Sequence, residues 1–260
     1  MASSLRLTYF DDNKGRNELT RLIFAVGQIS FEDELIGFPE YLRRRDAAAL
    51  PFDQIPTLQV GDTVLGQSCA IARYAARLAK LYPEDPLTAS VADAVVDSWR
   101  DQLDLLYDTF FERTVIAGKL QMFPRQQHER AWRIRVYLET SFRPWMMQME
   151  RKLMQGRFCP PDLTYAELAV FDLVCTVEGF VHPDVFNDVM QSHQKVSSLV
   201  RQVGEIPSIA EHLQQHPYTV LSDMFSEPNL VKQTLEFVMF PCMKLALSSW
   251  LGLKYCFRSS

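Results

Sequence analysis

Two polar residues at the start of a predicted helix could bind an anion. Gln67 and Ser68 directly precede residues 71–78, in which apolar residues recur at helical spacing. Ser68 occupies the expected N-cap position, where free backbone N–H groups and the positive end of the helix dipole favour a carboxylate. Helix capping by itself would also explain a serine here, but it does not require Gln67.

A proline in an otherwise apolar run could support a second kind of contact. Pro56 lies within "IPTLQV", residues 55–60, which reads as a strand. Proline donates no hydrogen bond to a sheet and belongs at strand starts or edges. If the peptide bond is cis, Ile55 turns its backbone N–H and C=O outward, where an extended peptide can pair with them. A trans proline that opens an edge strand is the alternative, and the sequence leaves both open.

Tyr9 stands at the end of the first predicted strand, residues 5–10, and polar residues follow it. A tyrosine in this place is commonly a core residue whose hydroxyl reaches water. It could equally hold its hydroxyl at the sheet edge where ligands of α/β proteins bind. Each of these three signals is weak when it is taken singly.

The elements around these residues predict a small α/β sheet of thioredoxin-like order. A strand, a helix and a second strand in about 30 residues make a βαβ unit with a right-handed crossover. Gly27 is expected to end the helix in a left-handed conformation. Gly61 and Asp62 suit a type II′ hairpin turn. The expected elements are strands at 5–10, 29–36, 57–60 and 63–65, and helices at 19–26 and 71–78.

Beyond "YPEDP", residues 82–86, the patterns predict helices. Thr164 and Glu167 form a capping box at the start of one of them, and Pro207 lies in the first turn of the last. Two further helices are expected over 125–154 and 184–203. The expected division is a thioredoxin-like domain (1–81), a linker (82–90), an all-α domain (91–225) and a C-terminal extension (226–260).

Composition narrows the function. The net charge of −5 gives no electrostatic reason to bind nucleic acid. The five cysteines are scattered without metal-ligand spacing, which predicts a reducing, cytoplasmic location and no metal site. The N-terminal residues lack the apolar run of a signal peptide. The extension over 226–260 has no uncharged run near the ~20 residues that span a bilayer. We expect it to pack onto the protein, with membrane-surface contact as the alternative.

Several motifs occur together in one characteristic order. They are "LTYF", "LPF-x-x-IPTL", "L-x-QS-x-AIARY-x-A" and "LTYAELAVFD". In this order and spacing the chain resembles the cytosolic glutathione transferases, most closely the sigma class, over roughly residues 4–222. The resemblance implies a thioredoxin-like domain followed by an all-helical domain, assembled as a homodimer. It also implies glutathione as co-substrate and a small hydrophobic electrophile as the second substrate.

The resemblance also implies roles for individual residues. Tyr9 would donate a hydrogen bond to the glutathione sulfur, and Arg16 would add positive potential near it. Ile55, with a cis Pro56, would pair with the cysteinyl backbone of glutathione. Asp101 would reach across the dimer to the α-amino group. The implied glutathione-binding set is Phe38, Arg44, Gln54, Ile55, Pro56, Gln67, Ser68 and Asp101.

The sequence departs from the family pattern where glutathione's glycyl carboxylate would bind. The family usually has tryptophan before a proline and lysine four residues later, whereas here the matching residues are Phe38 and Leu42. One arginine of the run 43–45 is expected to replace the lysine, and we predict Arg44. Arg100 stands where some sigma members have a carboxylate in a metal cluster, which argues against a divalent ion there.

The resemblance places the electrophile pocket between the domains, lined by Phe10, Leu103, Tyr107 and Phe111. Core packing is the alternative role of these side chains. The leading functional hypothesis is conjugation of glutathione to small apolar electrophiles. The alternatives are isomerisation of a prostaglandin-type endoperoxide and a non-catalytic, structural or partner-binding role like that of the S-crystallins.

Overall fold

The computed structural model describes residues 4–11, 14–116, 119–154, 156–160 and 163–218, so the predicted C-terminal extension lies outside the described residues. The N-terminal part is a four-stranded mixed sheet of order β2-β1-β3-β4. Strand β1 is parallel to β2 and antiparallel to β3, which pairs with β4 in a hairpin. The strands are β1 (Leu5–Phe10), β2 (Glu32–Ile36), β3 (Thr57–Val60) and β4 (Thr63–Gly66).

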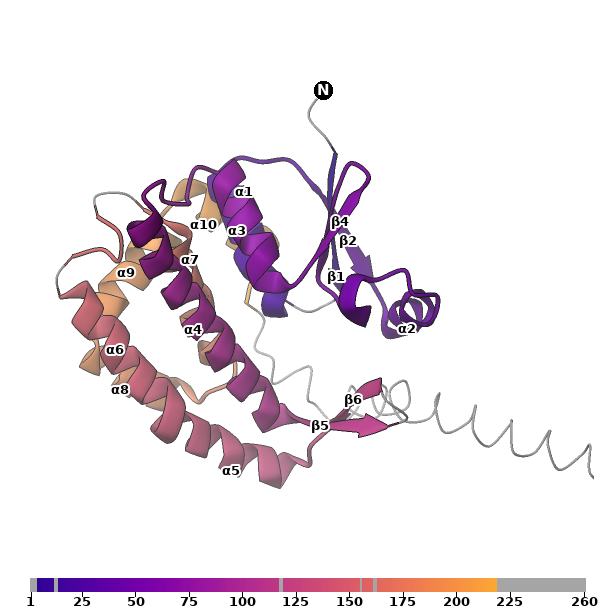
Figure 1. Cartoon of the computed structure of the whole chain (residues 1–260). Coiled ribbons are helices and arrows are strands. Elements are labelled where there is room, and N and C mark those ends of the chain that lie inside the picture. Colours follow the sequence, from indigo (N-terminus) through magenta and orange to yellow (C-terminus); the bar gives the residue numbers. More distant parts are fainter. Residues whose placement is uncertain (1–3, 12–13, 117–118, 155, 161–162, 219–260) are drawn as a thin grey trace, which may run out of the picture.

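Three helices accompany this sheet. Helices α1 (Glu18–Val26) and α3 (Ser68–Leu78) pack against each other beside it, and α2 (Phe38–Asp46) lies apart from them (Figure 1). The apolar residues that predicted α1 and α3 point into one core, and the following are fully buried: Leu7, Leu19, Leu22, Ile23, Leu58 and Ile71. The predicted βαβ unit and hairpin are therefore present.

Gly27 has a different role from the predicted left-handed cap. Its φ is −75°, and the left-handed residue is the next one, Gln28, with φ 51°. A Cβ atom on Gly27 would lie 2.6 Å from the Cβ of Ala79, just after α3. Glycine is needed here because the ends of α1 and α3 approach too closely for a side chain.

The C-terminal part consists of helices around a central buried one. Helix α7 contacts α4, α9 and α1, and nearly all of its residues are buried. The predicted capping box begins it: the Thr164 backbone N–H donates to Glu167 at 2.9 Å, and Ala166 N–H donates to the Thr164 hydroxyl. The helices are α4 (Pro86–Phe110), α5 (Gln127–Tyr137), α6 (Arg143–Leu153), α7 (Tyr165–Glu178), α8 (Pro183–Ser192), α9 (Gln194–Gly204) and α10 (Pro207–Gln215).

Three expectations for this part need correction. Helix α4 already begins at Pro86 because Asp85 caps it, accepting the Thr88 N–H at 2.8 Å, so the end of the predicted linker is helical. The helix expected over 125–154 contains a π-helical turn, Leu138–Phe142, between α5 and α6. The helix expected over 184–203 is two helices, because the backbone of His193 is not helical, with φ −131° and ψ 73°. The division into domains stays a prediction.

A β-hairpin connects α4 to α5, although no strand was expected there. Strands β5 (Phe111–Ile116) and β6 (Lys119–Pro124) form a separate two-stranded sheet that extends beyond the end of α4 (Figure 1). The β-branched residues at 114–116 favour extended backbone. The helical stripe predicted from Val95 ends at Phe110 for this reason. None of the helices in the described residues is both long enough and apolar enough to cross a membrane.

Candidate active site

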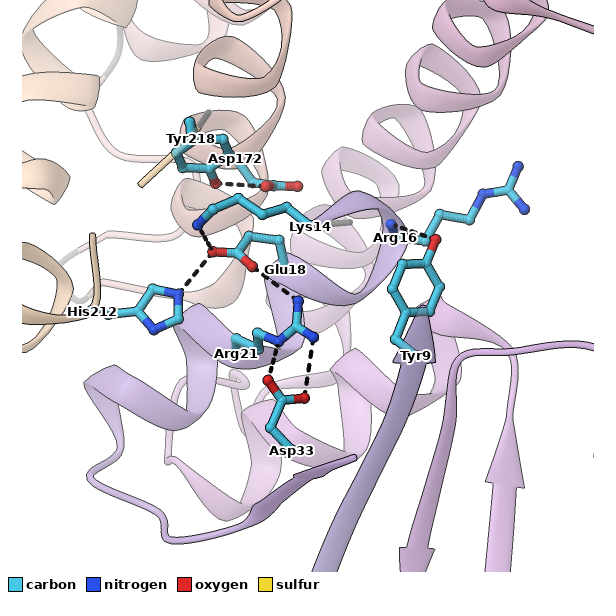
Figure 2. Close-up of polar contacts among 9 residues, drawn as sticks. All are labelled: Tyr9, Lys14, Arg16, Glu18, Arg21, Asp33, Asp172, His212 and Tyr218. Carbon is cyan, nitrogen blue, oxygen red and sulfur yellow. Dashed lines mark hydrogen bonds and ion pairs between the residues drawn. The ribbon is translucent and has the colours of Figure 1, made fainter. Parts of the chain in front are cut away.

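Tyr9 is held at the end of β1 with its ring buried and its hydroxyl engaged. The hydroxyl accepts a hydrogen bond from the backbone N–H of Arg16 at 3.3 Å (Figure 2). Burial raises the pKa of Tyr9, and the charge and backbone N–H of Arg16 oppose that rise only in part. The hydroxyl therefore keeps its proton at neutral pH and can donate it to an acceptor. Sequence reasoning did not find this backbone contact.

Gln67 has an unusual backbone conformation at the start of α3. Its φ of 71° and ψ of 113° lie outside the regions that non-glycine residues normally occupy, and such strain concentrates at functional sites. Gln67 is the N-cap residue, and its carbonyl accepts the N–H of Ile71 at 3.0 Å. Its side-chain Nε2 lies 3.5 Å from the side-chain Oε1 of Gln54, so the side chains of two predicted glutathione-binding residues meet.

Ser68 is the first residue of α3 and does not cap it, contrary to the prediction. Its side chain is almost fully buried, and its hydroxyl has no nitrogen or oxygen partner among the described residues. The Cys69 thiol, a weak hydrogen-bonding group, lies beside it. Capping thus fails to explain this serine. A buried hydroxyl is costly without a strong partner, and a bound carboxylate would supply one.

The Ile55–Pro56 peptide bond is cis, which decides between the two alternatives left open by the sequence. Strand β3 begins only at Thr57, opposite Thr8 and Gly66, so Ile55 stands outside the ladder. The preceding residue, Gln54, is extended, with φ −134° and ψ 156°. An extended segment with its backbone outside the sheet lies next to the Gln67 side chain, as peptide binding would require.

Phe38 belongs to an aromatic cluster that joins β1 to α2. Ring centroids lie 5.3 Å apart for Phe10 and Tyr41, and 5.7 Å apart for Phe38 and Tyr41. The Tyr41 hydroxyl donates to the Asp53 carbonyl at 3.1 Å, which ties α2 to the segment before Gln54. Phe10, predicted for the electrophile pocket, thus packs toward α2.

The structure engages Arg44 elsewhere. Its guanidinium binds both carboxylate oxygens of Glu34 at 2.8 Å and Glu40 at 2.7 Å, which uses all three nitrogens. Hydrogen bonds from Arg44, opposed by burial and aided by Thr8, lower the pKa of Glu34 to about 2. Arg45 instead lies 5.8 Å from the Tyr41 ring centroid, beside the aromatic cluster. The Arg44 guanidinium is thus already occupied, whereas Arg45, which also pairs with Asp46 at 3.2 Å, is the arginine beside the cluster. The role predicted for Arg44 stays a prediction.

Helix α4 forms the opposite wall of the site. The Arg16 guanidinium forms an ion pair with Asp104 and lies 5.6 Å from the Tyr107 ring centroid. Burial, followed by the charge of Tyr9, raises the pKa of Tyr107 well above its usual value. Leu103 is fully buried and serves the core, which was the alternative for the pocket residues. Phe111 is partly exposed as the first residue of β5.

Asp101 lies on another face of α4. It is exposed and lines a cavity of about 320 Å³ between α4 and the helical segment 138–153. The cavity is lined by Ser98, Asp101, Gln102, Thr140, Ser141, Pro144, Trp145 and Gln148. The structure of one chain therefore does not bring Asp101 together with the Tyr9 and Gln67 groups.

A buried carboxylate connects the segment between Tyr9 and Arg16, called the site loop below, to both parts of the protein. Glu18, at the start of α1, accepts Lys14 at 2.6 Å and lies 2.8 Å from His212 of α10 and 3.3 Å from Arg21 (Figure 2). Arg21 also binds Asp33 through two nitrogens. Burial favours a raised pKa for Glu18, but the His212 hydrogen bond and the Lys14 and Arg21 charges outweigh it and lower the pKa to about 2.

A second buried carboxylate lies close to the first. Asp172 accepts the Trp99 indole N–H at 2.9 Å and the Tyr218 hydroxyl at 2.7 Å. Burial, together with the charge of Glu18, raises its pKa to about 7. Lys14 lies 4.2 Å from the Tyr218 ring centroid. The loop between Tyr9 and Arg16 is thus anchored on the helical part.

Within the described residues, no group of three or more His, Cys, Asp or Glu could hold a metal ion.

Known proteins with similar sequence and structure match this architecture. The family model "Glutathione S-transferase, C-terminal domain" matches residues 117–216. Glutathione S-transferase 1 of Ascaris suum is 28% identical over 219 residues, covering 82% of this chain and 97% of its own. Human hematopoietic prostaglandin D synthase is 28% identical over 218 residues, covering 83% and 98%. The rat hematopoietic prostaglandin D synthase complexed with a quinoline aligns with a TM-score of 0.69 and 25% identity, covering 84% of this chain and 100% of that one.

The fold and the site together define a two-domain protein, in which a thioredoxin-like sheet carries a buried tyrosine hydroxyl and a helical domain forms the facing wall. The predicted fold class is confirmed. Residues 117–216 match the glutathione S-transferase C-terminal domain, and over about four fifths of its length the chain is similar to glutathione S-transferases and to hematopoietic prostaglandin D synthase.

Glu18 provides a test of the anchoring of the site loop. Because its pKa in the folded protein is about 2, below the ordinary 4.5, its ionised form stabilises the fold above pH 4.5, and this contribution is lost as the pH falls from 4.5 to 2. We expect Glu18→Gln to lower the free energy of unfolding at pH 7 by about 3 kcal/mol. Urea unfolding at several pH values measures this. The two stability curves should converge toward pH 2, and parallel curves would contradict the assignment.

Proposed function

We propose that this protein activates the glutathione thiol as a thiolate and conjugates it to small hydrophobic electrophiles. The observation that carries the proposal is the buried, protonated Tyr9 hydroxyl, held by the Arg16 N–H at the sheet edge. A free thiol is mostly protonated at neutral pH, whereas the thiolate is the nucleophile. A hydrogen bond donated by Tyr9 to the sulfur stabilises the thiolate and lowers the thiol pKa.

Glutathione would lie along the edge formed by the segments before β3 and α3. Ile55 would exchange backbone hydrogen bonds with the cysteinyl residue, next to the cis Pro56. The γ-glutamyl carboxylate would lie at the start of α3, where Gln67, the Ser68 hydroxyl and backbone N–H groups supply donors. Gln54 supports this end through its contact with the Gln67 amide.

The glycyl carboxylate would lie near the aromatic cluster of α2. Phe38 has no N–H to donate, so a cation is needed. Arg45 is the arginine of α2 beside the cluster, through its contact with Tyr41. The electrophile would enter between Tyr9 and the α4 wall, where Tyr107 and Phe111 offer apolar surface.

We further propose a homodimer, because Asp101 faces away from the other glutathione-binding residues of its own chain. One helical turn from Asp101, Leu105 is 44% exposed. Trp132 and Val136, which precede the cavity-lining Thr140 at four-residue spacing, are 60% and 37% exposed. These apolar side chains on α4 and α5 would pair with a second copy and bring Asp101 to its partner's glutathione. Cytoplasmic location stays a prediction of the sequence.

Tyr9→Phe tests the proposed activity. The variant keeps the ring but loses the donor, so we expect the pKa of bound glutathione's thiol to rise by about 1–2 units while binding persists. Thiolate absorbance, measured against pH in the wild type and the variant, reports this. Absence of a thiolate at neutral pH in the wild type would exclude the catalytic function and favour a non-catalytic role.

The same preparations distinguish conjugation from isomerisation. The relatives named prostaglandin D synthase suggest an endoperoxide as an alternative substrate. Conjugation consumes glutathione, and isomerisation returns it. We expect glutathione to be consumed with a small apolar electrophile. Turnover of an endoperoxide with no loss of glutathione would support the alternative.

Arg45→Gln, with Arg44→Gln as the matched control, tests the glycyl end. Loss of a charge-assisted hydrogen bond from Arg45 should raise the KM for glutathione by about tenfold or more without changing kcat. Arg44→Gln removes the same charge from the neighbouring residue, but its guanidinium is already used by Glu34 and Glu40. Its KM should stay near the wild-type value. The reverse result would return the role to Arg44.

Trp132→Asp tests the dimer and the role of Asp101 together. The buried charge should give a monomer in sedimentation equilibrium. Because Asp101 of the partner is then missing, affinity for glutathione should fall about tenfold, to the value of Asp101→Asn. Val185→Asp, at an exposed apolar residue of α8, is the control. A monomer that binds glutathione with full affinity would contradict the proposal.

A further inference from the structure

Asp104 of α4 lies between two arginines beside the proposed thiolate site. One of its carboxylate oxygens forms an ion pair with Arg16, and the other lies 3.1 Å from the Arg100 guanidinium. The three side chains are only 25% to 28% exposed. Their charges are therefore incompletely screened by solvent. Two guanidinium groups and one carboxylate leave a net charge of +1 for the three residues together.

The two arginines also keep unused hydrogen-bonding capacity. The Nε atoms of Arg16 and Arg100 are both buried, and neither has a partner among the described residues. A buried guanidinium N–H without an acceptor is costly. The three residues therefore have surplus donors as well as surplus positive charge, which suits a site that receives an anion.

This group of residues is connected to Tyr9 from two directions. The Arg16 backbone N–H donates to the Tyr9 hydroxyl, while its guanidinium extends away from Tyr9 toward α4 (Figure 2). Burial raises the pKa of Tyr9, and the charges that oppose this rise include those of Arg16 and Arg100. Arg100, one helical turn before Asp104, is thus within electrostatic range of the hydroxyl that would meet the sulfur.

We propose that Arg100 is a positioning residue of the active site, which balances the charge of Asp104 so that Arg16 keeps a net positive potential at the glutathione sulfur. This rests on the proposed thiolate activation. Asp104 alone would neutralise the charge of Arg16, and the pair would then contribute little electrostatic potential at the sulfur. With Arg100 on its other oxygen, Asp104 orients Arg16 while the group remains cationic. Arg100 acts through Asp104 and Arg16 and need not touch glutathione.

Removing the charge of Arg100 and removing the charge of Asp104 should shift the thiol pKa of bound glutathione in opposite directions. A merely structural role of the two residues does not predict opposite shifts. Arg100→Gln makes the group neutral, so the pKa of bound glutathione's thiol should rise by about 0.5–1 unit. Asp104→Asn makes it doubly positive, so the pKa should fall by a similar amount. The double variant restores the net charge of +1, and its thiol pKa should return to within about 0.3 unit of the wild-type value.

The measurement is thiolate absorbance of bound glutathione against pH in the full chain. Arg100→Lys should keep a near wild-type thiol pKa, and Arg143→Gln, which removes a surface arginine paired with Glu139 and Asp188, should also leave it unchanged. If both single variants shift the pKa in the same direction, or neither shifts it, the proposal is overturned. A wild type without thiolate would instead overturn the proposed function itself.

Discussion

The buried carboxylate of Glu18 is the interaction on which the site's geometry depends. An ionised carboxylate taken out of water costs several kcal/mol unless cations and hydrogen-bonding groups surround it. Lys14, Arg21 and His212 therefore have to converge on one point, although they come from the site loop, α1 and α10. Since Lys14 lies between Tyr9 and Arg16 in the chain, this convergence also sets where the Arg16 N–H meets the Tyr9 hydroxyl.

Helix α4 serves three purposes through its periodicity. Trp99 and Leu103 are buried against the helical core, with the Trp99 indole bound to Asp172. The residues that face the site, Arg100, Asp104 and Tyr107, recur at three- and four-residue spacing. Asp101 belongs to neither set and lines the cavity on the outer face. The helix therefore presents one face to the core, one to the site and one to the cavity, so its apolar residues do not all belong to the electrophile pocket.

Predictions from the sequence held where the interaction is local. The Thr164–Glu167 capping box, the Gly61–Asp62 turn and the β1–α1–β2 unit depend on residues a few positions apart. Contacts that a distant element decides could not be predicted from the sequence. Arg44 and Arg45 are adjacent and chemically identical, yet Arg44 binds Glu34 of β2 and Glu40, whereas Arg45 pairs with Asp46 and lies beside Tyr41. The β5–β6 hairpin likewise interrupted an expected run of helices.

The sequence by itself determined the elements of the N-terminal sheet, the start of the central helix, the resemblance to the family and a list of candidate residues for binding a small anionic peptide. It did so because helix periodicity, turn chemistry and motif spacing are properties of short segments. The tertiary structure decided which groups are already engaged: within the described residues it left the Ser68 hydroxyl without a nitrogen or oxygen partner, engaged Arg44 and placed Asp104 between two arginines. The physical reason is that a polar side chain can bind a ligand only if no other residue already occupies its hydrogen-bonding groups. The residues that could occupy them come from elements far away in the chain.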